Sequence, residues 1–145
     1  MQQRAGAGRE TATARILLVE DDALSLKLMR DVLEAHGYTV DQALNGADGL
    51  ALAREQVPDL IVMDIGLPAM DGVEVTRSLK SDAALAGIPV LAVTAYAMPR
   101  DEERMRRAGC DAFLTKPLRF SEFMLVVGRL LSGSDYSSAG SGNEK

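Results

Sequence analysis

The segment DLIVMDIGLPAMDG, residues 59–72, decides the fold of this chain. Its first half is an unbroken aliphatic run that ends in the acid Asp64, and a second such run, RILLVE, occupies residues 15–20. Aliphatic strands without polar alternation are buried on both faces, as in a parallel sheet covered by helices. Because a segment of helical periodicity comes after each run, we expect strands and helices to alternate.

Outward from this segment, the alternation repeats five times. The expected strands cover residues 15–20, 38–42, 59–64, 88–94 and 111–114. The expected helices cover residues 23–36, 47–56, 72–81, 99–108 and 120–131. Gly49 inside the second helix costs about 1 kcal/mol relative to alanine. Five such units predict a doubly wound α/β sheet, whose ligand site lies at the carboxyl ends of the strands.

The composition is that of one ordinary globular domain with a net charge of −5. This acidity argues against nucleic-acid binding, and no apolar run approaches the roughly 20 residues of a membrane span. The single cysteine, Cys110, excludes an internal disulfide, is expected to be a packed small residue, and is compatible with the cytoplasm. Residues 1–14 and 132–145 lack apolar periodicity and predict disordered tails around a domain at residues 15–131.

Chemically distinctive side chains collect at the strand ends. Asp21 and Asp22 come at the end of the first strand, Asp64 ends the third, Thr94 ends the fourth, and Lys116 follows the fifth. Carboxylates gathered at one sheet edge repel each other unless a cation is present, and hard oxygen ligands suit Mg²⁺. With Mg²⁺ bound, a carboxylate can attack phosphorus and form an acyl phosphate. The lysine and the threonine hydroxyl can then contact phosphoryl oxygens.

Each of these residues has an ordinary structural alternative. An acid at a strand end is most often a turn or cap residue, and Asp22 can simply cap the helix that starts at residue 23. Thr94 can be a strand-end hydroxyl, and Lys116 can be solvated. The convergence of all five side chains on one crevice favours the functional interpretation.

The same segments resemble the receiver domain of bacterial two-component response regulators. The matching stretches are ILLVEDD (16–22), DLIVMDIGLPAMDG (59–72), PVLAVTA (89–95) and AGCDAFLTKP (108–117). The resemblance extends from residue 15 to about residue 131, and within the family it is strongest to a single-domain regulator of the cell cycle. It implies a flavodoxin-like sheet in the order 2-1-3-4-5 with five helices, and a signalling protein rather than an enzyme.

Carried over by position, the resemblance implies a role for each acid. Asp64 would be the phosphoacceptor, which receives its phosphoryl group from a phosphohistidine. Asp21, Asp22 and the backbone carbonyl of Gly66 would join Asp64 in holding Mg²⁺. Position 66, two residues after the acceptor, is a glycine in this chain, whereas many receivers carry a side chain there.

The resemblance also implies a switch. Thr94 and Lys116 would contact the phosphoryl oxygens, and the peptide bond that follows Lys116 would be cis. Phosphorylation would draw Thr94 toward the phosphate, and the ring of Phe113 would turn inward into the space left. The alternative for Phe113 is an ordinary core aromatic.

Output is expected through protein contacts on the fourth helix, fifth strand and fifth helix. The predicted partner face includes Tyr96, Arg100, Arg107 and Arg119, with a solvated face of internal ion pairs as the alternative. The implied partners are a sensor or hybrid histidine kinase or a histidine phosphotransfer protein, and downstream protein targets. The implied location is the cytoplasm, with recruitment to the cell pole by a membrane kinase, and without nucleic acid or membrane insertion.

Three other classes fit the sequence less well. An aspartate-nucleophile phosphatase usually has a second acid two residues after the nucleophile, where this chain has Gly66. A nucleotide-binding module needs a glycine-rich loop after a strand, and acids follow the first strand here. A degenerate receiver that acts only as a docking scaffold would not need the complete set of acids, hydroxyl and lysine.

Overall fold

A computed structural model of the chain describes residues 14–67, 70–95 and 98–133. The strands are β1 (Arg15–Val19), β2 (Thr39–Ala43), β3 (Leu60–Asp64), β4 (Val90–Thr94) and β5 (Ala112–Thr115). The helices are α1 (Ala23–Ala35), α2 (Gly46–Gln56), α3 (Gly72–Ser81), α4 (Pro99–Ala108) and α5 (Phe120–Ser132). The predicted alternation is confirmed, and the element ends differ from the expected ones by no more than two residues.

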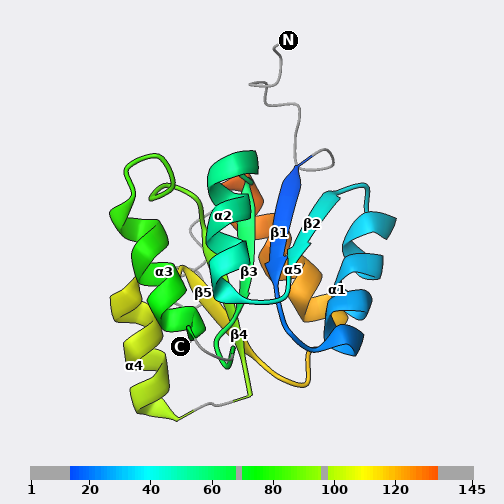
Figure 1. Ribbon diagram of the computed structural model, residues 1–145. Helices are drawn as coiled ribbons and strands as arrows, with labels where there is room; N and C mark the ends of the chain where they lie inside the picture. Colours follow the sequence, from blue (N-terminus) through cyan, green and yellow to red (C-terminus); the bar gives the residue numbers. More distant parts are fainter. Residues whose placement is uncertain (1–13, 68–69, 96–97, 134–145) are drawn as a thin grey trace.

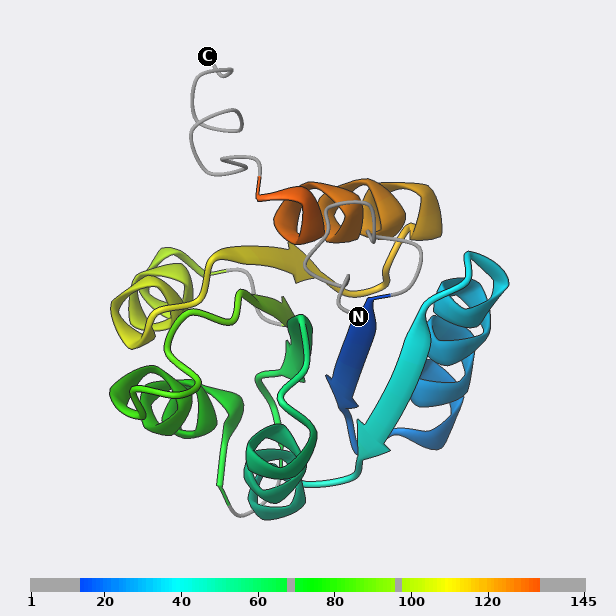
Figure 2. The same cartoon turned by 90° about the horizontal axis from the view of Figure 1, so that it is seen from above.

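The five strands form one parallel sheet in the order β2-β1-β3-β4-β5, which confirms the predicted fold. Figure 1 shows this sheet running through the centre of the molecule between its helices. Seen from above, α1 and α5 lie on one side of the sheet and α2, α3 and α4 on the other (Figure 2). The chain order reverses beside β1, which is where a doubly wound sheet places its ligand crevice.

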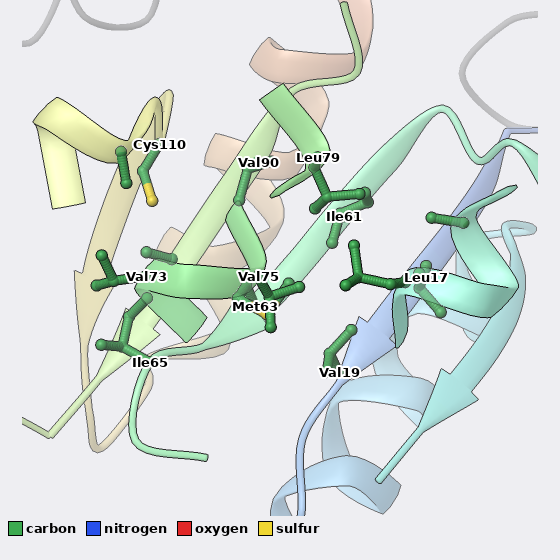
Figure 3. Packing of buried hydrophobic residues seen from close by; sticks show 14 of the residues in the cluster. Leu17, Val19, Ile61, Met63, Ile65, Val73, Val75, Leu79, Val90 and Cys110 are labelled. Atoms are coloured by element: carbon green, nitrogen blue, oxygen red, sulfur yellow. The ribbon is translucent and has the colours of Figure 1, made fainter. Parts of the chain in front are cut away.

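The core consists of two hydrophobic clusters, one on each face of the sheet. Leu17 and Val19 of β1 belong to the cluster covered by α2, α3 and α4, whereas Ile16 and Leu18 belong to the cluster covered by α1 and α5. Figure 3 shows the first cluster, with side chains of β1, β3 and β4 packed together. Both faces of these strands are thus buried, which explains their aliphatic composition.

Gly49 has a packing reason that outweighs its low helix propensity. A Cβ atom at this position of α2 would lie 2.9 Å from Val19 Cγ2, so glycine lets the helix approach β1. Within the described part of the chain, no helix is long and apolar enough to cross a membrane. Of the two predicted tails, only Ala14, Ser132 and Gly133 lie among the described residues, and Ser132 is still part of α5.

Candidate functional site

Asp64 is the last residue of β3, and its carboxylate is only 7% exposed to solvent. Its Oδ1 atom accepts a hydrogen bond from the backbone N–H of Gly66 at 3.0 Å, and its Oδ2 atom lies 3.7 Å from Lys116 Nζ. One carboxylate oxygen is therefore oriented by the loop after β3 and the other by a cation from the loop after β5.

Two further carboxylates join Asp64 at this edge of the sheet. Ligand oxygens of Glu20, Asp21 and Asp64 all lie within 4.8 Å of one another. Glu20 is 1% exposed, and its Oε1 atom accepts a hydrogen bond from Lys116 Nζ at 3.0 Å. Lys116 therefore bridges two of the three acids.

Asp22, which we expected among the metal ligands, has another place in the structure. It is the N-cap of α1, where its Oδ2 atom accepts a hydrogen bond from the backbone N–H of Ser25 at 2.8 Å. This hydrogen bond lowers the pKa of the exposed Asp22 carboxylate. The acid pair beside Asp64 is thus Glu20 and Asp21, one residue earlier than expected.

The reason is the end of β1. We expected the strand to include Glu20, but it ends at Val19, and the Glu20 N–H then bonds to the Ala43 carbonyl at 3.0 Å. The sequence signal for this strand end is its last aliphatic residue, Val19. A strand predicted to end there leaves Glu20 and Asp21 as the first two loop residues. Asp22 then stands directly before the helix that starts at residue 23, in the N-cap position.

The charges of the site are unbalanced. Burial and the nearby Asp64 together raise the pKa of Glu20 to about 7, against the lowering effect of the hydrogen bonds from the Asp22 N–H and Lys116. Burial acts to lower the pKa of Lys116, but its hydrogen bond to Glu20 and the charge of Asp64 raise it overall. Three acids and one lysine occupy the site, and the donor set of hard carboxylate oxygens fits a divalent cation such as Mg²⁺.

A cleft of about 460 Å³ begins beside the acceptor. It is lined by Ile65, Gly66, Leu67, Asp71, Thr94, Met98, Arg100, Asp101 and Arg104. Since Gly66 has no side chain, this side of the Asp64 site stays open to the cleft. The carboxylate of Asp71, the N-cap of α3, lies 3.5 Å from Arg104 of α4 and so connects the two walls.

Thr94 ends β4 and is 2% exposed. Its backbone carbonyl accepts a hydrogen bond from the Lys116 N–H at 2.8 Å, which ties the end of β4 to the loop that carries the lysine. The Lys116–Pro117 peptide bond is cis, as the resemblance implies. The structure therefore brings Asp64, Thr94 and Lys116 to one edge of the sheet.

Phe113 lies on β5 and is half-buried. It pairs in register with Ala92 and packs against the same cluster as Ala92. Side chains two residues apart on a strand share a face, so Thr94 lies on the face of β4 that Phe113 packs beside. The expected switch pair thus occupies one face of the sheet, under α4.

The described residues of the predicted partner face lie on α4 and at the start of α5. Arg100 lines the cleft described above, and Arg107 donates a hydrogen bond to Glu103 on its own helix at 3.1 Å. Arg119 is the N-cap residue of α5 and makes no side-chain cap hydrogen bond. Tyr96 lies outside the described residues.

Cys110 is buried at the end of α4, as expected for a packed residue. Its Sγ atom lies 3.9 Å from Thr76 Oγ1, and burial raises the pKa of the thiol to about 11. A thiol with this pKa is almost entirely protonated at neutral pH and is a poor nucleophile.

Known proteins match the chain over nearly the whole of this fold. A sequence model described as the response regulator receiver domain matches residues 16–127. The chain is 51% identical over 112 residues to the polar-differentiation response regulator DivK of Brucella anthropi, with 77% of this chain and 91% of that protein covered.

Solved structures agree with the fold. The receiver domain of a sensor histidine kinase from Pseudomonas aeruginosa, determined with a magnesium ion coordinated in the active site cleft, is 32% identical with a TM-score of 0.78, covering 84% of this chain and 99% of that chain. The chemotaxis protein CheY4 of Vibrio cholerae, at 24% identity and a TM-score of 0.78, covers 81% of this chain and 98% of that one and is similar in fold.

Proposed function

Since this chain belongs to the response regulator receiver domain family, whose members signal in two-component systems, we propose that it is a phosphoacceptor that takes a phosphoryl group from a phosphohistidine onto Asp64. One observation carries the proposal. A buried carboxylate at a strand end faces a lysine ammonium at 3.7 Å and two further acids whose ligand oxygens lie within 4.8 Å.

Asp64 is the nucleophile of the proposed transfer. One of its carboxylate oxygens attacks the phosphorus, the P–N bond to the donor histidine breaks, and the imidazole leaves with a proton from water. The hydrogen bond from the Gly66 N–H fixes the carboxylate plane before the attack. Little covalent chemistry is then asked of the protein beyond positioning and neutralising charge.

Mg²⁺ is the proposed cofactor, and it would be held by carboxylate oxygens of Glu20, Asp21 and Asp64, with the Gly66 carbonyl as a further ligand by resemblance. When bound, it supplies positive charge next to the incoming phosphoryl oxygens. The relative with a magnesium ion in its active site cleft supports this assignment. Asp22 belongs to the helix cap in this proposal and not to the metal site.

Lys116 and Thr94 are the proposed phosphoryl contacts. With Mg²⁺ neutralising the acids, the ammonium group that now bridges Glu20 and Asp64 becomes available to a phosphoryl oxygen. The Thr94 hydroxyl would bond another oxygen, and Phe113 on the same sheet face would respond to its movement. Phosphorylation would thus be read at the surface formed by α4, β5 and α5.

The phosphodonor protein is proposed to dock beside α1. Leu24 and Leu28 of α1 are 65% and 42% exposed, and exposed apolar side chains at a reactive site mark protein contacts. A largely apolar cleft of about 180 Å³ connects Leu28 to the active-site lysine. It is lined by Ser25, Leu28, Met29, Lys116, Pro117, Leu118 and Phe120. A sensor or hybrid histidine kinase, or a histidine phosphotransfer protein, is the proposed occupant.

Downstream protein targets are proposed to bind the surface formed by α4, β5 and α5, with Arg100, Arg107 and Arg119 among the contacts. Charge reversal at Arg100 or Arg107 that left target binding unchanged would contradict this assignment. The proposed location is the cytoplasm, with recruitment to the cell pole by a membrane kinase, and the name of the polar-differentiation relatives supports the polar part of this proposal.

The central test is intact-mass analysis after incubation with Mg²⁺ and a small phosphodonor. Wild-type protein is expected to gain one phosphate, and Asp64→Asn is expected to gain none. The proposal would be contradicted if the wild-type protein gained no phosphate, or if Asp64→Asn gained as much phosphate as wild type. Asp59→Asn is a matched control, because Asp59 lies at the other end of β3, where it binds the backbone N–H of Arg15.

A further inference from the structure

Arg106 of α4 lies over the ring of Phe113 in β5. Its Cζ atom is 5.5 Å from the ring centroid, within the roughly 6 Å at which a cation–π contact forms. The arginine side chain is 62% exposed, and its ion-pair partner among the described residues is Glu103, at 4.0 Å. The guanidinium group is therefore held mainly by the aromatic face beneath it.

The position of this ring links the contact to the active site. Phe113 lies opposite Ala92 on β4, and Thr94 is two residues further along the same face of that strand. Thr94 ends β4 next to Asp64, since β3 and β4 are paired with Asp64 opposite Val93. The side chain directly opposite the ring on β4 is only a methyl group.

We propose that Arg106 is a positioning residue that holds the ring of Phe113 in its present half-exposed place. A phosphoryl group on Asp64 then has to act against this contact when it draws Thr94 and the ring inward. The inference rests on the proposed function, because it assigns Arg106 a part in regulating that same site. Nothing in it requires Arg106 to touch the phosphate.

Linkage sets the size of the effect. A ligand that binds better when the ring of Phe113 is turned inward loses affinity if the contact with Arg106 favours the outward ring. The affinity falls by the same factor by which the contact favours the outward ring. A cation–π contact at an exposed site favours the state in which the contact is formed by about two- to five-fold. Removal of the contact should therefore raise the apparent affinity for an activating phosphate analogue by about the same factor.

The test is a calorimetric titration of the full chain with beryllium fluoride in saturating Mg²⁺. Arg106→Met keeps the apolar stem and removes the charge, whereas Arg107→Met removes the neighbouring charge. Arg107 is a matched control because it is exposed, shares Glu103 as its partner and contacts no ring among the described residues. Its proposed contact with downstream targets plays no part in this titration, which contains no target. Both substitutions are repeated in a Phe113→Leu background, which completes a double-mutant cycle.

The expected result is an apparent dissociation constant about two- to five-fold lower for Arg106→Met and unchanged for Arg107→Met. Arg106→Lys should lie between wild type and Arg106→Met, and Arg106→Met should have no effect when position 113 is leucine. An unchanged constant for Arg106→Met, or an equal decrease in the leucine background, overturns the inference. Wild-type protein that does not bind beryllium fluoride overturns the phosphoacceptor function itself, and the role of Arg106 with it.

Discussion

The ammonium group of Lys116 lies 3.0 Å from Glu20 Oε1 and 3.7 Å from Asp64 Oδ2, so one cation joins the carboxylate that follows β1 to the carboxylate that ends β3. Together with Asp21, these two carboxylates leave the site with more negative than positive charge. A buried site with this imbalance either takes up protons or binds a cation. The first two predictions follow from this competition.

Glu20→Gln is expected to weaken Mg²⁺ binding by about 10-fold or more, because even the loss of an outer-shell partner costs a metal site about this much. Asp22→Asn should leave Mg²⁺ affinity nearly unchanged, since asparagine still caps α1. Calorimetric titration with Mg²⁺ measures both. A larger loss of Mg²⁺ affinity for Asp22→Asn than for Glu20→Gln would show that Asp21 and Asp22, rather than Glu20 and Asp21, bind the metal beside Asp64.

Metal-free protein is expected to lose stability as the pH rises from about 5 to about 7.5. The pKa of Glu20 is about 7 in the folded chain against an ordinary 4.5, so in this interval the folded state binds more protons than the unfolded state. Stability therefore falls with rising pH, and Mg²⁺ should restore it at the upper end. Thermal denaturation with and without Mg²⁺ measures the trend, and Glu20→Gln, which cannot ionise, should flatten it. A melting temperature that rises across this interval in metal-free protein would contradict the assigned pKa.

Gly72→Ala is expected to destabilise the protein by about 1–3 kcal/mol, as overpacking of a close contact does. A Cβ atom at position 72 would lie 2.5 Å from the carbonyl oxygen of Asp64 and 2.8 Å from Ile65 Cα, both of them backbone atoms. Phosphorylation should slow as well, because the acceptor itself would be displaced. Thermal denaturation and intact-mass kinetics measure the two effects.

Gly128→Ala in α5 is the matched control for this substitution. Apart from α5 itself, no atom of the described residues lies within 4 Å of a Cβ atom at position 128, so alanine should stabilise the helix by up to about 1 kcal/mol. Equal effects of the two substitutions would show that helix propensity, rather than contact with Asp64, governs position 72.

Leu28→Glu is expected to slow phosphotransfer from a phosphorylated histidine protein by about 10-fold or more, as the loss of a central apolar contact costs over 1 kcal/mol. The rate with a small phosphodonor should be unchanged, because Leu28 lies on the exposed face of α1 and not among the acids. Gel-based transfer assays and intact mass measure the two rates. Leu125→Glu on α5, at a side chain of similar exposure, is the control. Equal slowing with both donors would exclude a docking role for Leu28.

Most of the fold follows from local patterns. The aliphatic runs of β1, β3 and β4 predict a parallel sheet because only strands covered on both faces carry such runs. The resemblance to receivers added the strand order, which no local pattern contains. Gly49 shows the limit of local reasoning, since its low helix propensity is explained only by the approach of α2 to Val19.

By itself, the sequence determined which chemical groups gather at the carboxyl edge of the sheet: carboxylates after β1 and at the end of β3, a hydroxyl at the end of β4 and a lysine after β5. Only the tertiary structure decided that Glu20, rather than Asp22, stands beside Asp64, because the end of β1 is set by its hydrogen bonds to a neighbouring strand. Only the tertiary structure placed Arg106 over Phe113, since that distance depends on how α4 packs on the sheet. Residue type is a property of the chain, whereas register and helix packing are settled by contacts between segments far apart in it.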